Sequence, residues 1–251
     1  MGADSHTCTY GAFGAFGTGI GCTDFLYAMV TGQSWVLVPD TIRFNLHGKL
    51  REGVYARDLM LSIIGMVGAN GCNYKIMEFA GEGAHNLDID ERLVLCNLAV
   101  EAGAKTGIVE PDEKVVEYVE SRGRKAENLF KSDDDAVFEK VYDINLDEIK
   151  PVVARPHQID DVVDAKEVAD VKALEEGIIT TLMEAGAMVM NCNCSVCWGS
   201  CQGVIGKDEV LISTGTRNFK GRAGHPDSYV YLGSAATVTA SAIAGKITTA
   251  D

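Results

Sequence analysis

Residues 191–201 read NCNCSVCWGSC, and this stretch holds four of the eight cysteines of the chain. The Cys-x-x-Cys spacing of Cys194 and Cys197 lets two thiolates reach one metal ion or iron–sulfur cluster from a single turn of loop. Cys192 and Cys201 either add ligands or take no part. The alternative is a disulfide or a set of inert buried thiols, but four cysteines so close together favour a metal or cluster site.

The sequence on both sides of this loop alternates between helical and strand patterns. Residues 172–185 carry apolar side chains at helical spacing, and 187–190 and 210–214 are short apolar runs that predict buried strands. A strand or turn at 229–232 and a small-residue helix at 235–244 follow. Because strand ends commonly present functional loops, residues 171–251 are predicted to form an α/β domain that carries the cysteine loop.

A second candidate loop, 215–222, follows the strand at 210–214 and contains Arg217 and Arg222. A guanidinium can bind a carboxylate through two parallel hydrogen bonds, so two arginines on one loop suit a carboxylate ligand. The alternative is an ordinary basic surface loop.

The composition is that of a globular protein of 251 residues, with 47% hydrophobic and 23% charged residues. The formal net charge of −14 argues against nucleic acid or an acidic membrane as the main partner, but leaves a small anionic substrate open. Eight unevenly spaced cysteines do not resemble a secreted disulfide framework. No targeting signal and no apolar run near eighteen residues is present, so the predicted location is the cytoplasm.

Residues 1–106 predict a second α/β domain. Strands are expected at 35–39, 41–48 and 75–79, and apolar and polar residues alternate along the second of them. Helices are expected at 24–31, 55–67 and 91–102, and Asp88 or Asp90 can cap the last. Gly17, Gly19 and Gly21 precede the first helix, but without a preceding strand they do not predict a dinucleotide site. Close packing of a glycine-rich helix start on a neighbouring sheet is the better interpretation.

Polar residues at two places in this domain are candidates for catalysis. Asp4, Ser5 and His6 are expected at a strand-to-loop end, where reactive groups are often presented. Asn97 and Glu101 are four residues apart on the helix at 91–102 and therefore share one face. The sequence leaves open whether Glu101 lines a cleft or lies on a solvated surface.

The intervening residues differ in character. Residues 107–170 are predicted to form an acidic peripheral subdomain with an exposed helix at 111–122, a strand at 152–154 and a linker at 160–170. The predicted domains are therefore 1–106, 107–170 and 171–251.

Together these motifs resemble the aconitase superfamily, and within it the large subunits of 3-isopropylmalate dehydratase, homoaconitase and related methylmalate-type dehydratases. The matching stretches occur in family order and cover nearly the whole chain: 4–12, 32–39, 78–81, 96–104, 194–199 and 217–222. The resemblance implies an aconitase-like arrangement of three-layer α/β/α domains with the active-site cleft between them. It also implies a hydro-lyase that dehydrates a hydroxy di- or tricarboxylic acid and rehydrates it at the adjacent carbon, as in leucine biosynthesis.

The resemblance assigns a role to each polar motif. Asp4 and His6 match the pair that assists departure of the substrate hydroxyl, and Ser5 lies between them as a substrate contact. Glu101 matches a carboxylate that manages the same proton, and Asn97 an amide beside the cluster. Residues Arg217 and Arg222 match the arginines that hold a substrate carboxylate.

The resemblance also implies a cofactor and a partner. A [4Fe–4S] cluster would be held by three cysteines, of which Cys194 and Cys197 match two, with one iron left free as a Lewis acid. The serine base of the family lies on a swivelling domain, which in these enzymes is a separate small subunit.

The sequence departs from the family pattern in two segments. A segment that precedes residue 1 in the family is absent, and the family's Ser-Cys-Thr-Asn motif, expected between Val168 and Leu174, is missing. Cys192 or Cys201 is then the candidate third ligand of the cluster. A shortened catalytic subunit is the leading interpretation, and a non-catalytic metal-binding or assembly module is the alternative.

Overall fold

The computed structural model describes residues 1–168 and 203–249, which fall into two compact units. Unit 1 comprises residues 1–51 and 67–149, and unit 2 comprises residues 52–66 and 150–251. These limits differ from the three ranges predicted from the sequence, because strand β4 (Lys140–Asn145) joins the first sheet rather than a peripheral subdomain. The predicted boundary at 170 lies outside the described residues.

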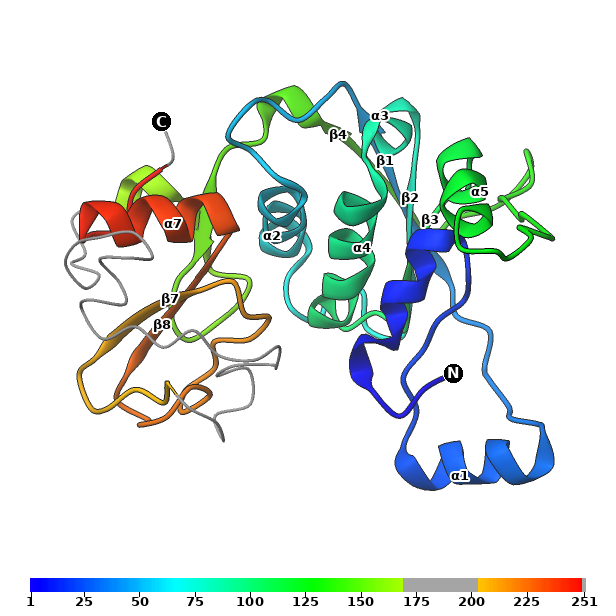
Figure 1. The fold of residues 1–251 in the computed structure, drawn as a ribbon, viewed down its shortest axis with the longest axis horizontal. Coiled ribbons are helices and arrows are strands. Elements are labelled where there is room, and N and C mark those ends of the chain that lie inside the picture. The colour runs from blue at the N-terminus through cyan, green and yellow to red at the C-terminus, as the bar shows by residue number, and fades with distance from the viewer. Residues whose placement is uncertain (169–202, 250–251) are drawn as a thin grey trace. The chain divides into compact units, whose positions relative to one another are not determined.

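Unit 1 is built on a parallel four-stranded sheet of order β3-β2-β1-β4 (Figure 1). The other three strands are β1 (Thr41–His47), β2 (Ile76–Ala80) and β3 (Thr106–Val109). Burial alternates along β1, with Ile42, Phe44 and Leu46 buried, as the predicted alternation required. The Phe44 ring stacks between Phe79 of β2 and Tyr142 of β4, at centroid distances of 5.6 and 5.3 Å. These side chains fix the core of the unit.

The helices of unit 1 lie beside these strands, except for α1 (Cys22–Thr31), which stands away from the sheet (Figure 1). The remaining elements are the 3-10 helices η1 (Ser5–Phe13), η2 (Ala99–Ala102) and η3 (Leu146–Glu148), and the α-helices α3 (Glu82–Asn86), α4 (Ile89–Leu98) and α5 (Glu113–Glu120). Asp88 begins α4 with a capping box to Glu91, which confirms one of the two caps predicted there.

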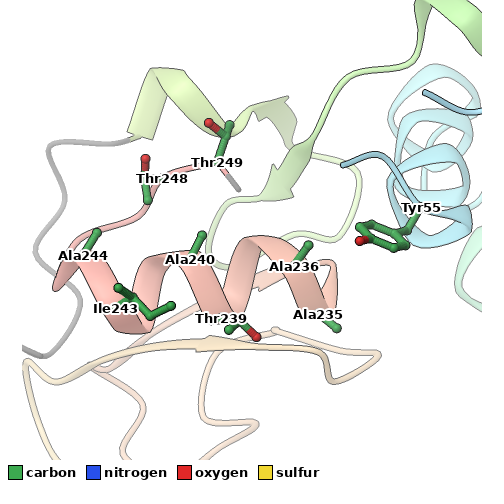
Figure 2. A pocket seen from close by; sticks show the side chains of 9 residues that line it. All are labelled: Tyr55, Ala235, Ala236, Thr239, Ala240, Ile243, Ala244, Thr248 and Thr249. Atoms are coloured by element: carbon green, nitrogen blue, oxygen red, sulfur yellow. The ribbon is translucent and has the colours of Figure 1, made fainter. Parts of the chain in front are cut away.

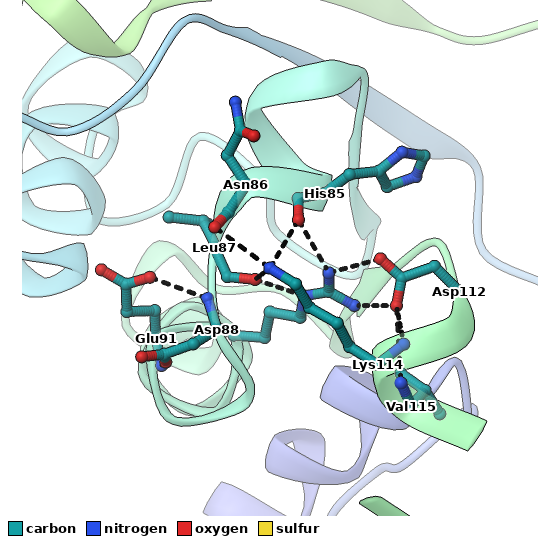
Figure 3. A network of polar contacts seen from close by, with 9 residues as sticks. His85, Asn86, Leu87, Asp88, Glu91, Asp112, Lys114 and Val115 are labelled. Carbon is teal, nitrogen blue, oxygen red and sulfur yellow. Dashed lines mark hydrogen bonds and ion pairs between the residues drawn. The ribbon is translucent and has the colours of Figure 1, made fainter. Parts of the chain in front are cut away.

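A buried arginine holds three of these helices together. Arg92 of α4 is fully buried and donates two hydrogen bonds, of 2.8 and 2.6 Å, to the carboxylate of Asp112, the N-cap of α5. Lys114 donates to the carbonyl oxygens of His85, Asn86 and Leu87, where α3 ends (Figure 3). The network satisfies helix-end groups that would otherwise lack partners.

Unit 2 contains a mixed four-stranded sheet of order β6-β5-β8-β7. Its strands are β5 (Val152–Ala154), β6 (Val162–Asp164), β7 (Val210–Ser213) and β8 (Tyr229–Gly233), and its helices are α2 (Ala56–Val67), η4 (Ala165–Val168) and α7 (Ala235–Ala244). Strands β7 and β8 are parallel, whereas β5 is antiparallel to both β6 and β8. The α/β class predicted from the sequence is therefore confirmed in both units.

Three local predictions were wrong. Residues 35–39 form no strand, and Trp35 and Val38 are 84% and 85% exposed, because no neighbouring strand pairs with this apolar run in the described chain. The segment 160–170 is not a plain linker, since it contains β6 and η4. Asp4 lies at the N-cap of the 3-10 helix η1 rather than at the end of a strand. The predicted helix at 172–185 and strand at 187–190 lie outside the described residues.

Candidate active site

The candidate site of unit 1 begins with a cap at the start of η1. The backbone N–H of His6 donates to Oδ1 of Asp4 at 2.7 Å, and the hydroxyl of Thr7 donates to the Asp4 carbonyl at 2.7 Å. The hydroxyl of Ser5 lies 3.2 Å from Nδ1 of His6, and Oδ1 of Asp4 lies 3.8 Å from the same nitrogen. The two residues before His6, Asp4 and Ser5, therefore lie against one edge of its imidazole.

The other edge of the imidazole faces Glu101. Nε2 of His6 lies 3.3 Å from Oε1 of Glu101, whose side chain is only 8% exposed. Nε2 is buried and makes no well-aligned hydrogen bond among the described residues, so this contact is one of charge and proximity. An imidazole placed between an exposed and a buried carboxylate can pass a proton between them.

Glycines allow the segment that leads to α1 to approach η1 closely. A Cβ on Gly19 would lie 2.6 Å from the carbonyl oxygen of Asp4 and 3.0 Å from Cα of Ser5. One on Gly17 would lie 2.4 Å from the carbonyl oxygen of Thr7. These glycines thus pack on the segment that carries Asp4 and Ser5, and not on a sheet as predicted. Gly11 of η1 makes the expected close approach to a strand, at Gly107 of β3.

Helix α4 is joined to η1 through Asn97. The Asn97 side-chain amide donates to the hydroxyl of Thr9 at 2.9 Å, and the backbone carbonyl oxygen of Asn97 accepts from the thiol of Cys8 at 3.5 Å. Burial raises the pKa of Cys8 to about 11, so this thiol stays protonated and serves packing. Thr9 and Cys8 were not singled out from the sequence, because only the fold brings them to Asn97.

The candidate arginines lie in unit 2, on the turn after β7. Arg217 and Arg222 are half-buried, and the Arg222 guanidinium lies 5.3 Å from the ring centroid of Phe219. Asn218 is 2% exposed and donates to the carbonyl of Arg155 at 2.8 Å, which anchors the turn to the segment after β5. A guanidinium hydrogen bond from Arg57 of α2 to the Gly215 carbonyl anchors the other end. The two guanidiniums are therefore carried on a supported turn.

A hollow of about 680 Å³ runs along α7 in unit 2 (Figure 2). Its lining consists of small or aliphatic side chains and threonine hydroxyls from α7 and the segment after it, with Tyr55 at one end. Among the described residues that line it, the phenol of Tyr55 is the only group that could transfer a proton.

The predicted cluster ligands Cys192, Cys194, Cys197 and Cys201 lie outside the described residues. Within residues 1–168 and 203–249, no group of three histidine, cysteine, aspartate or glutamate side chains is placed to hold a metal ion. No helix in the same part of the chain is long and apolar enough to cross a membrane.

The geometry of unit 1 thus places a histidine of η1 between two carboxylates, an arrangement that can transfer protons. The chain belongs to the aconitase family: the family model described as aconitase (aconitate hydratase) matches residues 1–175 and 167–245.

Its curated relatives belong to the dehydratase branch of that family. The chain is 42% identical to the probable 3-isopropylmalate dehydratase large subunit of Methanothermobacter thermautotrophicus, over 99% of the chain and 70% of the relative. It is 41% identical to the 3-isopropylmalate dehydratase large subunit 1 of Pyrococcus furiosus, over 98% and 70%. It is 39% identical to the corresponding large subunit of Aquifex aeolicus, over 98% and 69%. These relatives identify the chain as a hydro-lyase sequence of the aconitase family.

The alignments also show that the chain is shorter than its relatives. They extend over 295, 296 and 299 positions, more than the 251 residues of the chain. The relatives therefore carry residues inside the matched region that this chain lacks, as the sequence analysis predicted.

Proposed function

We propose that the chain is the cluster-bearing large subunit of a hydro-lyase that isomerises a hydroxy diacid, 3-isopropylmalate or a homologue, by loss and re-addition of water. The placement of His6 between Asp4 and Glu101 carries the proposal, because loss of a hydroxyl as water needs a proton donor and re-addition needs a base. The relatives are named 3-isopropylmalate dehydratases, and this name supplies the proposed substrate.

The residues of unit 1 suit this proton transfer. Nε2 of His6 lies 3.3 Å from the nearly buried Glu101, so a proton can be held on this pair and delivered to a leaving hydroxyl. Asp4 fixes the start of η1 through the His6 backbone and keeps its carboxylate near Nδ1. Ser5, with its hydroxyl exposed beside the imidazole, is a hydrogen-bond donor for the substrate.

The arginines and Asn97 take the roles of substrate contacts. The guanidiniums of Arg217 and Arg222 are suited to a substrate carboxylate, since each can donate two parallel hydrogen bonds to it. The hydrogen bond to Thr9 fixes the direction of the Asn97 amide. These roles are proposals for each residue separately, because they belong to two units.

The proposed cofactor is a [4Fe–4S] cluster held by Cys194, Cys197 and either Cys192 or Cys201. Cysteine thiolates are the ligands that such clusters require, and four occur within 192–201. When bound, the cluster would supply a Lewis-acidic iron for the substrate hydroxyl and carboxylate. The proposed partner is a small subunit, since the relatives are named large subunits. We also propose a cytoplasmic location for the complex.

Turnover in the presence of a small subunit tests this proposal. The full chain is reconstituted anaerobically with iron and sulfide, mixed with the small subunit of a 3-isopropylmalate dehydratase, and supplied with 3-isopropylmalate. We expect absorbance of the unsaturated diacid to appear only in the mixture. A reconstituted chain that binds about four irons without turnover would instead support a non-catalytic cluster-binding module.

The cluster is tested separately by iron content and electron paramagnetic resonance. The wild-type chain is expected to bind iron and to give a three-iron signal on oxidation, and Cys194→Ser and Cys197→Ser to lose both. Cys72→Ser is the matched control, because Cys72 is fully buried in unit 1 and lies far from the cysteine loop in sequence. Iron binding unaffected by either loop substitution would contradict the assigned ligands.

A further inference from the structure

A groove beside Ser5 leads away from the proposed acid–base group in unit 1. One hollow of about 300 Å³ is lined by Ser5, Gly19, Val100 and Lys105, among others. A second, of about 590 Å³, shares Gly19 and Lys105 with it. The two hollows therefore form one groove that begins at a residue of the candidate site.

Among the described residues that line this groove, Lys105 is the one with a positively charged side chain. It follows η2, which carries Glu101, and immediately precedes β3. Its ammonium group lies 5.4 Å from the ring centroid of Tyr74, and no carboxylate in the described part of the chain lies within ion-pair distance of it. By contrast, Lys75 is paired with both Asp40 and Glu139. In a chain of net charge −14, a lysine without an acidic partner on a groove wall is available to an anion.

The two hollows differ in chemistry. None of the described residues that line the hollow next to Ser5 is acidic, so a carboxylate can lie there beside Lys105. The larger hollow is lined by the aromatic rings of Tyr27, Trp35 and Tyr74, and by Asp24. The Asp24 carboxylate would repel a second anion, whereas the rings suit an apolar group.

We propose that this groove binds a hydroxy diacid with one carboxylate on Lys105 and Ser5, and its branched apolar substituent against the aromatic rings of the larger hollow. The inference rests on the proposed function and extends it, because it assigns the side chain that holds the second carboxylate and the wall that accepts the alkyl group. Lys105 is a substrate-binding residue in this account and has no part in proton transfer.

Direct binding of the diacid to the full chain tests the assignment without requiring turnover. The dissociation constant of 3-isopropylmalate is measured by calorimetry for the wild type and for Lys105→Gln, Lys105→Arg and Lys131→Gln. Lys131 lines a separate hollow of about 240 Å³ in the same unit and is the matched control. Loss of a charge-assisted hydrogen bond should weaken binding about tenfold or more in Lys105→Gln. Lys105→Arg keeps the positive charge, and Lys131 lines a separate hollow. The dissociation constants of the Lys105→Arg and Lys131→Gln chains should therefore lie within about threefold of the wild-type value.

Two ligand analogues locate the interaction. In the first analogue, an amide replaces the carboxylate farther from the hydroxyl. The wild type should bind this analogue as weakly as Lys105→Gln binds the diacid. Lys105→Gln should bind the analogue no more weakly than the wild type does. If the alkyl group is removed, as in malate, all four chains should bind more weakly by a common factor. Equal binding of the diacid by wild type and Lys105→Gln would overturn the proposal, and so would absence of diacid binding to the wild type.

The outcome also separates this inference from the proposed function. Lys105-dependent binding without turnover beside a small subunit would contradict the hydro-lyase proposal and leave the groove assignment standing. Turnover with an unchanged KM in Lys105→Gln would contradict the groove assignment alone, whereas a raised KM at unchanged kcat would support both.

Discussion

Nε2 of His6 lies 3.3 Å from Oε1 of Glu101, which joins the first turn of the chain to the helical segment that follows α4. The Asp4 carboxylate lies on the opposite edge of the same ring, with Oδ1 3.8 Å from Nδ1. Both ring nitrogens therefore face a carboxylate, which places the imidazole between two groups that can take up or release a proton. This relationship is the physical basis of the proposed acid–base chemistry.

Substitution of Glu101 by glutamine should remove that chemistry. The amide is nearly isosteric but cannot take up a proton, so kcat of the reconstituted complex should fall by about 10² to 10⁴ while KM changes little. The matched control is Glu113→Gln, an exposed acid of α5, which should leave kcat unchanged. An equal kcat in Glu101→Gln and the wild type would show that Glu101 handles no proton.

The glycine at position 19 should prove necessary for the geometry of Asp4 and Ser5. A Cβ there would lie 2.6 Å from the Asp4 carbonyl oxygen, so Gly19→Ala should displace this segment and lower kcat by about 10²-fold, as sub-ångström to ångström misplacements do. A Cβ on Gly206, which lies outside the groove, would meet only the Glu209 side chain at 3.6 Å, an ordinary contact. Gly206→Ala should therefore retain activity. The prediction fails if the two variants behave alike.

The buried pair of Arg92 and Asp112 should dominate the stability of unit 1. Removal of one partner leaves the other charge buried, so Arg92→Met should lower the free energy of unfolding by about 3 to 5 kcal/mol. Lys125→Met breaks a salt bridge in which the lysine is 78% exposed, and should cost about 1 kcal/mol or less. Urea denaturation followed by circular dichroism measures both, and similar losses in the two variants would contradict the assignment.

The same pair predicts a loss of stability in acid. Burial raises the pKa of Asp112, but the hydrogen bonds and charge of Arg92 lower it by more, so the net pKa lies below the ordinary 3.8. A carboxyl with a lowered pKa stabilises the fold above its unfolded pKa and loses this contribution as the pH falls through its folded pKa. Wild-type stability should therefore decline below about pH 4, and Arg92→Met should show less of this decline.

Asp58 in unit 2 should have the opposite effect. It is fully buried, and desolvation raises its pKa to about 6, against hydrogen bonds from the backbone N–H groups of Val152 and Tyr55. The folded state therefore binds the proton more tightly than the unfolded state, whose pKa is near 3.8. The Asp58 contribution to stability is greatest below about pH 3.8 and falls, by up to about 3 kcal/mol, as the pH rises to about 6.

Denaturation of the full chain between pH 4 and 7 measures this effect. Asp58→Asn cannot ionise and should flatten the pH dependence across that range. Asp134→Asn, an exposed acid, should leave the dependence as in the wild type. Identical pH profiles for Asp58→Asn and the wild type would refute the assigned pKa.

The sequence predicted best the helices and strands whose formation depends on side chains close together in the chain. The apolar alternation of β1 and the cap of α4 follow from side chains within a few residues, and both were predicted at nearly the observed positions. The run at 35–39 has equally strong strand composition, yet forms no strand. A strand needs a neighbour with which to pair, and composition cannot show whether one is present.

Position and spacing made the two polar groups of unit 1 candidates, and the family resemblance assigned their roles, but neither placed Glu101 against His6. Nothing near His6 in the sequence indicates that Glu101 lies against its ring, because the contact depends on how η1 packs on β3 and α4. Lys105 gave no signal at all, since a single lysine before a strand is ordinary. Only the groove around it and the lack of an acidic neighbour among the described residues distinguish it.

Exchange of the substrate hydroxyl with solvent tests the hydro-lyase proposal most directly. The reconstituted chain and a small subunit are incubated with 3-isopropylmalate in ¹⁸O-labelled water, and the diacid is analysed by mass spectrometry. We expect incorporation of one solvent oxygen by the wild type, and little or none by Glu101→Gln carrying the same amount of iron. Absence of label with the iron-loaded wild type, or equal labelling by both chains, would contradict the proposal.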